Sequence, residues 1–226
     1  MIRHVFEEVG CIVQARMTSK RFPGKVVADL MGAPVIVQVL SRLVSVGFDR
    51  VIVAVPDNEA QQPILDAIDQ FYDLDDEIGI FTGSEDNVLE RYYEAASHFD
   101  LDYICRITAD CPFIDPFCVE DVVDALLHSD KDYVSNVWPI RAVFKGYDAE
   151  AFTFAALEKA HNAATDTYDL EHVTPWMQRN LKTLNIAYEG RKYSDIDNLN
   201  LCVDYPEDIE RLKELIKSFG DKEVVS

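Results

Sequence analysis

Short apolar runs that suit β-strands alternate along the first half of this chain with segments whose apolar residues recur at helical spacing. The stretch 35–47, for example, repeats Ile36, Val39, Leu40 and Leu43 on one helical face. The expected order is strand 11–16, helix 35–47, strand 50–56, helix 64–71, strand 79–82, helix 88–96 and strand 103–108. Such alternation is typical of βαβ units. It therefore predicts an α/β fold with a mainly parallel sheet and a site at the carboxyl ends of the strands.

The regular alternation ends after a fifth strand-like run at 131–137. Residues 138–195 contain expected helices at 153–164 and 168–180 among less regular segments. Because no Pro/Gly/Ser-rich linker precedes this segment, we interpret it as a lid or dimer-forming insertion within a single domain of residues 1–226. The chain closes with an expected strand at 200–204 and a helix opened by Pro206.

Composition narrows the classes of partner. The 226 residues carry a formal net charge of −20, which repels phosphodiester backbones and anionic lipid surfaces, so we expect neither a nucleic-acid nor a membrane partner. No run is long enough to span a bilayer, and the start, MIRHVFEEVG, lacks the pattern of a signal peptide, so a cytoplasmic location is expected. The five cysteines form no CxxC pair, which favours reduced, mostly structural thiols over a metal site.

A cluster of positive charge follows the first expected strand. The stretch QARMTSKRFPGK, residues 14–25, contains Arg16, Lys20, Arg21 and Lys25 and a Pro-Gly turn. Backbone N–H groups, guanidinium groups and ammonium groups placed between a strand and a helix bind several phosphate oxygens together. The alternative is a solvated surface loop whose lysines only aid solubility. Neither GxxxxGK[ST] nor GxGxxG occurs, so a P-loop or a dinucleotide motif is excluded.

Carboxylates follow other strands that should end at the same edge. Asp110 comes just after the run YICRIT, and Asp204 lies in VDYPED before the last helix. Oxygen ligands of this kind suit Mg²⁺, which takes one or two protein carboxylates together with substrate phosphates. The alternative for each aspartate is a turn or helix-capping role. Asp148 and Glu150, in GYDAEAF, should lie on one side of an extended segment, and His172 is either a structural residue or a substrate contact.

With these segments in place, the chain resembles the cytidylyltransferases related to the spore coat polysaccharide biosynthesis protein SpsF, and more distantly the CMP-sialate and CMP-Kdo synthetases. The resemblance runs in order along nearly the whole chain, through VQARMTSKRFPGKV, FTGSEDNVLERYYEAA, YICRITADCPFIDP, DYVSN, GYDAEAF, DLEHVTPW and VDYPEDIERL. It implies a three-layer α/β/α sandwich of the GT-A-like type, with an insertion after the fifth strand, and usually homodimers. Phe22 stands where Leu is usual in the first motif, and GYDAEAF replaces the commoner GLDVEVF.

The resemblance also implies roles for individual residues. The triphosphate would be held by Arg16, Ser19, Arg21 and Lys25, of which Arg16, Arg21 and Lys25 act in catalysis together with Asp110. Mg²⁺ would be bound by Asp110 and Asp204. The remaining CTP contacts would be Ala15, Gly83, Ser84, Arg106 and Thr108, with Gly83 and Ser84 near the cytosine and ribose. The acceptor would contact Asn136, Asp148, Glu150, Glu171 and His172.

The expected activity is transfer of CMP from CTP to an acidic sugar or related acceptor, with release of pyrophosphate, in the synthesis of surface polysaccharide precursors. Two alternatives stay open. A GT-A glycosyltransferase would use a nucleotide-sugar donor, but such enzymes usually carry a DxD motif where this chain has Thr108-Ala109-Asp110. A catalytically silent nucleotide-binding protein would not need the basic loop together with both aspartates.

Overall fold

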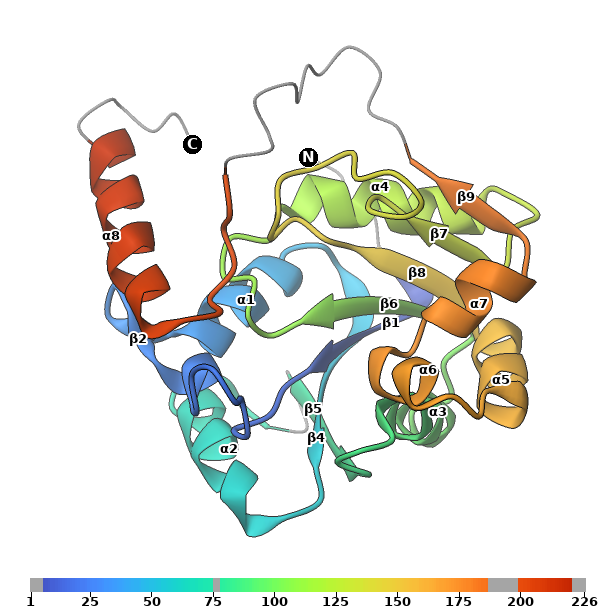
Figure 1. Ribbon diagram of the computed structural model, residues 1–226, viewed down its shortest axis with the longest axis horizontal. Helices are drawn as coiled ribbons and strands as arrows, with labels where there is room; N and C mark the ends of the chain where they lie inside the picture. Colours follow the sequence, from blue (N-terminus) through green and yellow to red (C-terminus); the bar gives the residue numbers. More distant parts are fainter. Residues whose placement is uncertain (1–5, 75–77, 187–198, 221–226) are drawn as a thin grey trace.

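A computed structural model describes residues 6–74, 78–186 and 199–220 of the chain. Within these ranges a seven-stranded sheet has the order β5-β4-β1-β6-β8-β7-β9 (Figure 1). Its strands are β1 (Phe6–Gln14), β4 (Phe48–Pro56), β5 (Ile78–Gly83), β6 (Tyr103–Thr108), β7 (Tyr133–Ser135), β8 (Glu150–Thr153) and β9 (Thr183–Asn185). Strand β8 is antiparallel to both neighbours, whereas the other strand pairs of this sheet are parallel. The prediction of a mainly parallel sheet is confirmed.

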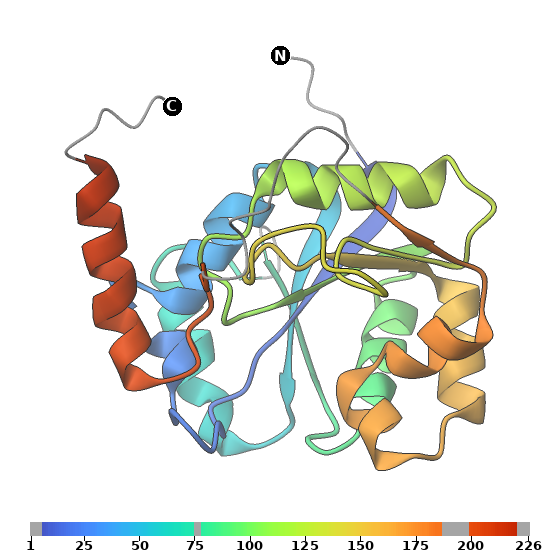
Figure 2. The same ribbon diagram turned by 45° about the horizontal axis from the view of Figure 1, so that its top comes forward.

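Helices cover both faces of the sheet, as Figures 1 and 2 show. The α-helices are α1 (Val35–Leu43), α2 (Gln62–Asp69), α3 (Val88–His98), α4 (Pro116–Leu127), α5 (Phe154–Ala163), α6 (Thr167–His172), α7 (Pro175–Asn180) and α8 (Pro206–Gly220). Two short 3₁₀ helices, η1 (Lys25–Val27) and η2 (Glu59–Gln61), and a small hairpin of β2 (Asp29–Leu30) and β3 (Ala33–Pro34) complete the described elements.

The core has two halves, one on each face of the sheet. In β1, Cys11 and Val13 pack into the cluster that contains residues of α1, α2 and α4, whereas Ile12 packs into the cluster with residues of α3 and α5. Successive strand residues point to opposite faces, so a strand buried on both sides becomes a continuous apolar run. The expected three-layer α/β/α sandwich is therefore confirmed.

Two expected elements differ from the structure. The helix expected at 168–180 is broken, because α6 ends at His172 and Val173 takes a φ of +71° before Pro175 opens α7. Proline lacks an N–H group, so Pro175 cannot continue the hydrogen bonds of α6, and it stands at the start of α7, where that N–H is not needed. The prediction of a strand at 200–204 is also wrong. This segment makes one isolated bridge, from Asn200 to Lys145, and the Val203 N–H donates to the Asp110 carbonyl at 2.8 Å.

The segment 138–195 contributes more than a peripheral insertion. Strand β8 lies between β6 and β7 inside the sheet, and β9 pairs with β7 at its edge. Residues 187–198 of this segment lie outside the described residues. Its function in acceptor binding or dimerisation stays a prediction.

The last helix packs on a third apolar cluster. Ile209 and Leu212 of α8 are buried with Leu30, Val35 and Val203. This contact brings the segment before α8 to the carboxyl ends of the strands (Figure 1). Asp204, in this segment, lies 3.4 Å from Lys25. The C-terminal part of the chain thereby completes a site that begins in its first twenty-five residues.

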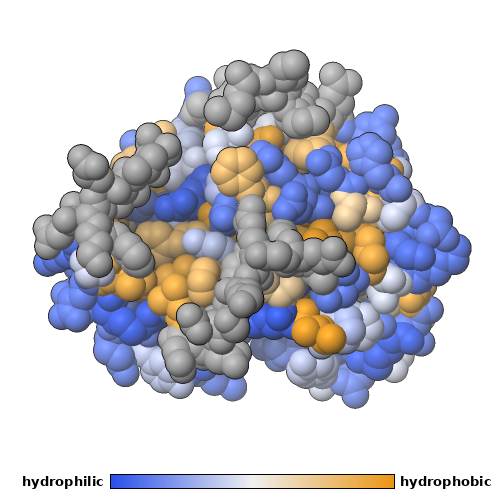
Figure 3. Space-filling model, turned by 90° about the horizontal axis from the view of Figure 1, so that it is seen from above, coloured by the Kyte–Doolittle hydropathy of each residue, from blue (hydrophilic) through white to orange (hydrophobic). Residues whose placement is uncertain are grey.

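Hydrophilic residues occupy much of the described surface in the view from above (Figure 3). None of the described helices combines the length and apolar character needed to cross a membrane. All five cysteines are buried and free of disulfides, as expected for structural thiols.

Candidate active site

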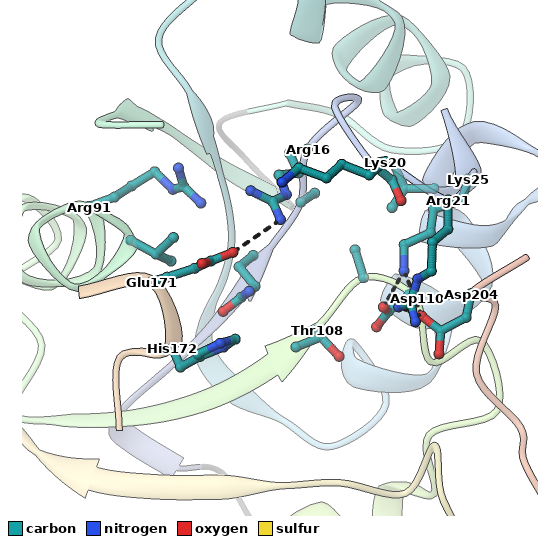
Figure 4. A pocket seen from close by; sticks show the side chains of 16 residues that line it. Arg16, Lys20, Arg21, Lys25, Arg91, Thr108, Asp110, Glu171, His172 and Asp204 are labelled. Carbon is teal, nitrogen blue, oxygen red and sulfur yellow. Dashed lines mark hydrogen bonds and ion pairs between the residues drawn. The ribbon is translucent and has the colours of Figure 1, made fainter. Parts of the chain in front are cut away.

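A cleft of about 480 Å³ opens at the carboxyl ends of β1 and β6 (Figure 4). It lies where neighbouring connections leave the parallel sheet in opposite directions, which is the usual place for ligands in open α/β sheets. Its lining brings together Lys20 of the basic cluster and ten of the predicted site residues: Ala15, Arg16, Ser19, Arg21, Lys25, Thr108, Asp110, Glu171, His172 and Asp204.

The basic loop has a defined backbone. The Met17 N–H donates to Gln61 Oε1 at 2.8 Å, and the Gly24 N–H donates to the Met17 carbonyl at 2.9 Å. Gly24 has a φ of +73°, a left-handed conformation that glycine adopts without steric cost and that directs the chain into η1. The loop therefore presents Lys25, the first residue of η1, toward the cleft.

Lys25 joins the two aspartates that were expected to bind metal. Its Nζ donates to Asp110 Oδ2 at 2.6 Å and to Asp204 Oδ1 at 3.4 Å. The side chains of Lys25 and Asp204 are each 13% exposed, and that of Asp110 is 25% exposed. The ammonium group thus marks a point at which both carboxylates converge.

Asp204 has two further cationic partners. Arg21 donates to Asp204 Oδ1 at 2.6 Å, and Lys145 donates to Oδ2 at 3.1 Å. Partial burial by itself would raise the pKa of Asp204, but the hydrogen bond from Lys145 and the charges of Lys25, Lys145 and Arg21 together hold that pKa below its ordinary value. Asp204 is therefore a carboxylate that stays ionised. Sequence reasoning missed Lys145, which lies in the irregular stretch WPIRAVFKG.

Arg21 is oriented from its other side by an aromatic ring. Its guanidinium carbon lies 5.1 Å from the centroid of the Tyr205 ring. A hydrogen bond with Tyr205 and the charge of Asp204 raise the pKa of Arg21, so it remains a permanent cation at the mouth of the cleft. The side chain is 53% exposed, which leaves guanidinium N–H groups accessible to an anion.

The two convergent carboxylates fit a hydrated divalent cation. The described residues contain no group of three or more His, Cys, Asp or Glu side chains arranged to hold a metal. Mg²⁺ nevertheless needs only one or two protein carboxylates when phosphates and water supply its other ligands. Asp110 and Asp204 meet that requirement next to the basic loop 14–25, so the donor set suits Mg²⁺.

Two arginines, Arg16 and Arg91, lie at the end of the cleft opposite to Asp110 and Asp204 (Figure 4). Arg16 pairs with Glu171 at 3.5 Å, and both side chains are about half exposed, at 45% and 52%. Arg91 of α3 also lines the cleft but is only 1% exposed. It was not predicted as a site residue. The sequence did contain a sign of it, because Arg91 lies among Val88, Leu89 and Tyr92 on the buried helical face, where an arginine is unusual.

A second cavity of about 240 Å³ adjoins the first, because Thr108 and His172 line both. Arg106 was expected to bind CTP, but it lines this second cavity and pairs with the buried Glu150 of β8. Burial alone would lower the pKa of Arg106, yet the charge of Glu150 raises it overall. Glu150 Oε1 also accepts hydrogen bonds from Tyr133 and from Thr174, the latter at 2.8 Å.

Four other predicted contacts have different surroundings. Gly83 and Ser84 line a separate cavity of about 620 Å³ beside the cleft. Asp148 lines the second cavity and is held by Arg141 through two hydrogen bonds of 2.6 and 2.8 Å. Asn136 is fully buried, and its amide bonds the backbone of Tyr147 and Ala149, so its visible role is structural.

Basic residues facing a pair of carboxylates at the carboxyl ends of a parallel sheet are typical of α/β proteins that bind nucleoside triphosphates with a divalent cation. Comparison with known proteins agrees with this class of protein. Residues 10–225 match the cytidylyltransferase family, and the chain belongs to this family. Membership of this family supports the assignment of the protein as a CTP-dependent nucleotidyltransferase.

Individual relatives show how far the similarity extends. A solved structure of a cytidylyltransferase from Leptospira borgpetersenii is 28% identical, with a TM-score of 0.83 over 96% of this chain and 88% of that one. The spore coat polysaccharide biosynthesis protein SpsF of Bacillus subtilis is 26% identical over 95% of this chain and 89% of its own length. The 3-deoxy-manno-octulosonate cytidylyltransferase of Agrobacterium fabrum is 32% identical over 49% of this chain and 43% of its own length.

Proposed function

We propose that this protein transfers CMP from CTP to a hydroxyl group of a sugar-acid-like acceptor, with release of pyrophosphate, in the synthesis of a surface polysaccharide precursor. The convergence of Lys25 on Asp110 and Asp204, beside Arg21, is the observation that carries this proposal. The names of the related SpsF protein and of the 3-deoxy-manno-octulosonate cytidylyltransferase support the pathway and the acceptor class. A homodimer and a cytoplasmic location remain part of the proposal.

In this reaction an acceptor oxygen attacks the α-phosphorus of CTP in line with the departing pyrophosphate. Little covalent work falls to the protein, so positioning and charge stabilisation dominate. Arg16, Arg21 and Lys25 would bind the triphosphate oxygens and stabilise the negative charge that develops on the leaving pyrophosphate. Arg21 and Lys25, which pair with Asp204 in this structure, would then bind phosphate oxygens in place of this carboxylate.

Asp110 and Asp204 would hold Mg²⁺, which when bound supplies charge neutralisation to the phosphate oxygens. The acceptor would occupy the second cavity, since Thr108 and His172 belong to the walls of both cavities. Thr174 and Gln178 there add a hydroxyl and an amide, which suit recognition of acceptor hydroxyl groups.

The test is incubation of the purified protein with CTP, Mg²⁺ and a panel of sugar acids, including 3-deoxy-manno-octulosonate, while pyrophosphate is measured. Acceptor-dependent pyrophosphate release with formation of a CMP-linked product supports the proposal. Transfer from a nucleotide-sugar in the same panel would indicate a glycosyltransferase instead. Tight binding of CTP without turnover of any acceptor would favour a silent nucleotide-binding protein.

A further inference from the structure

Two buried polar atoms in the cleft have no hydrogen-bond partner among the described residues. They are Nε of Arg91, a donor, and Oε1 of Gln14, an acceptor. Buried polar atoms are nearly always paired, because leaving one unpaired costs about 1–3 kcal/mol. Two such atoms in one cleft point to a ligand that offers both an acceptor and a donor.

Arg91 is the more unusual of the two. It is 1% exposed, and its Nη1 donates to the Ser84 carbonyl, yet no carboxylate pairs with it in the ranges that the structure describes. Burial and the charge of Arg16 lower the pKa of Arg91. A buried cation without a counter-ion is unfavourable unless other groups satisfy its donors. Such a residue is better explained by ligand binding than by stability.

The position of Arg91 indicates which part of a nucleotide it meets. In Figure 4, Lys25, Arg21, Asp110 and Asp204 gather at one end of the cleft, and Arg91 lies at the other. With the triphosphate at the metal and lysine end, the nucleoside extends toward Arg91. Phosphate oxygens only accept hydrogen bonds, so a phosphate cannot satisfy the Gln14 acceptor, whereas the edge of a base carries both donors and acceptors.

We propose that Arg91 determines the selectivity for cytosine by donating two guanidinium N–H bonds to O2 and N3 of the base. This inference rests on the proposed function and deepens it. Both atoms are acceptors in cytosine, whereas N3 of uracil carries a hydrogen and would oppose a guanidinium donor. The planar fork of arginine matches two adjacent acceptors, which the ammonium group of lysine cannot do. The Ser84 carbonyl holds the guanidinium in place, and Oε1 of Gln14 is available to the exocyclic amino group that uracil lacks.

The first test is calorimetric binding of CTP, UTP and inorganic triphosphate, each with Mg²⁺, to the wild type and to Arg91→Lys. The expected result is CTP binding weakened roughly ten- to hundredfold, a CTP-to-UTP ratio that falls toward one, and unchanged triphosphate binding. Arg50→Lys is the matched control. Arg50 contacts the Phe99 ring near the start of β4, at the sheet end opposite the cleft, so its replacement should alter none of these affinities.

A second test needs no variant and decides the matter if Arg91→Lys does not fold. Binding of 3-deazacytidine triphosphate to the wild type removes the N3 acceptor and keeps O2 and the amino group. We expect this analogue to bind at least about tenfold more weakly than CTP. Equal binding of the analogue and CTP would overturn the role of Arg91, as would a parallel loss of triphosphate binding in Arg91→Lys. If the wild type binds no nucleotide at all, the proposed function itself fails.

Discussion

Replacing Asp110 by Asn separates the chemistry of the site from its contribution to folding. The side chain of Asp110 is 25% exposed, and within the described ranges its one ion-pair partner is Lys25, at 2.6 Å. Lys25 also contacts Asp204 at 3.4 Å, so it should retain a carboxylate partner after the change. A partly exposed pair of this kind contributes about 1 kcal/mol at most, so the melting temperature should fall by no more than about 2–4 °C.

The same substitution should remove most of the activity. Asn retains the shape and one oxygen of Asp110 but loses the charge that a divalent cation requires, so turnover should fall at least about a hundredfold. The assay is pyrophosphate release from CTP over a range of Mg²⁺ concentrations, with an acceptor that supports wild-type turnover, next to thermal unfolding of both proteins.

Asp115→Asn provides the control for Asp110→Asn. Asp115 caps α4 by accepting from the Phe117 N–H at 3.0 Å, and Asn caps helices equally well, so activity and stability should both persist. Turnover of Asp110→Asn within about threefold of the wild type at all Mg²⁺ concentrations would refute the metal assignment. A large loss of stability in this variant would refute the claim that Asp110 serves chemistry more than folding.

Three further substitutions probe the surroundings of the site. Because the cations around Asp204 lower its folded pKa, its charge stabilises the fold above its unfolded pKa of about 3.9 and this contribution is lost as pH falls through the folded pKa. In urea unfolding Asp204→Asn should therefore be less stable than the wild type at pH 7, with a smaller difference near pH 3, and a constant difference would contradict the assignment. Glu150→Gln leaves Arg106, whose side chain is only 14% exposed, without its counter-ion. It should cost about 3–5 kcal/mol, or about 6–20 °C in melting temperature, whereas an unchanged melting temperature would show that the pair is dispensable. Gly146 has a φ of +109°, and an added Cβ would lie 2.8 Å from Cβ of Leu201. Gly146→Ala should therefore lower the free energy of unfolding by about 1–3 kcal/mol. An unchanged urea midpoint would show that the backbone adjusts.

The sequence alone was sufficient for β1, β4, β5, β6 and β7, for α1, α2, α3, α5 and α8, and for one side of the site, but not for α4, β8 or β9. Runs buried on both faces and helices with one apolar face have local patterns that predict these elements directly. Since parallel strands end at the same edge, Lys25 and Asp110 were expected to meet although they are 85 residues apart, and the structure places them 2.6 Å apart. The family motifs pointed to the same loop and aspartates, and the comparisons confirm the family.

Only the tertiary structure decided which charges neutralise one another. Arg106 is as basic as the residues of the loop 14–25, but β8 places Glu150 against it, and Arg106 lines the second cavity instead of the cleft. Lys145 reaches Asp204 because the segment before α8 crosses the strand ends beside it. Arg91 remains without a carboxylate partner among the described residues, although its helix also contains Glu90 and Glu94. A residue type reveals what a side chain can bind, whereas its partner depends on segments distant in the chain. Folding brings those segments together. Burial then increases the free-energy difference between a charged group that has a partner and one that lacks it.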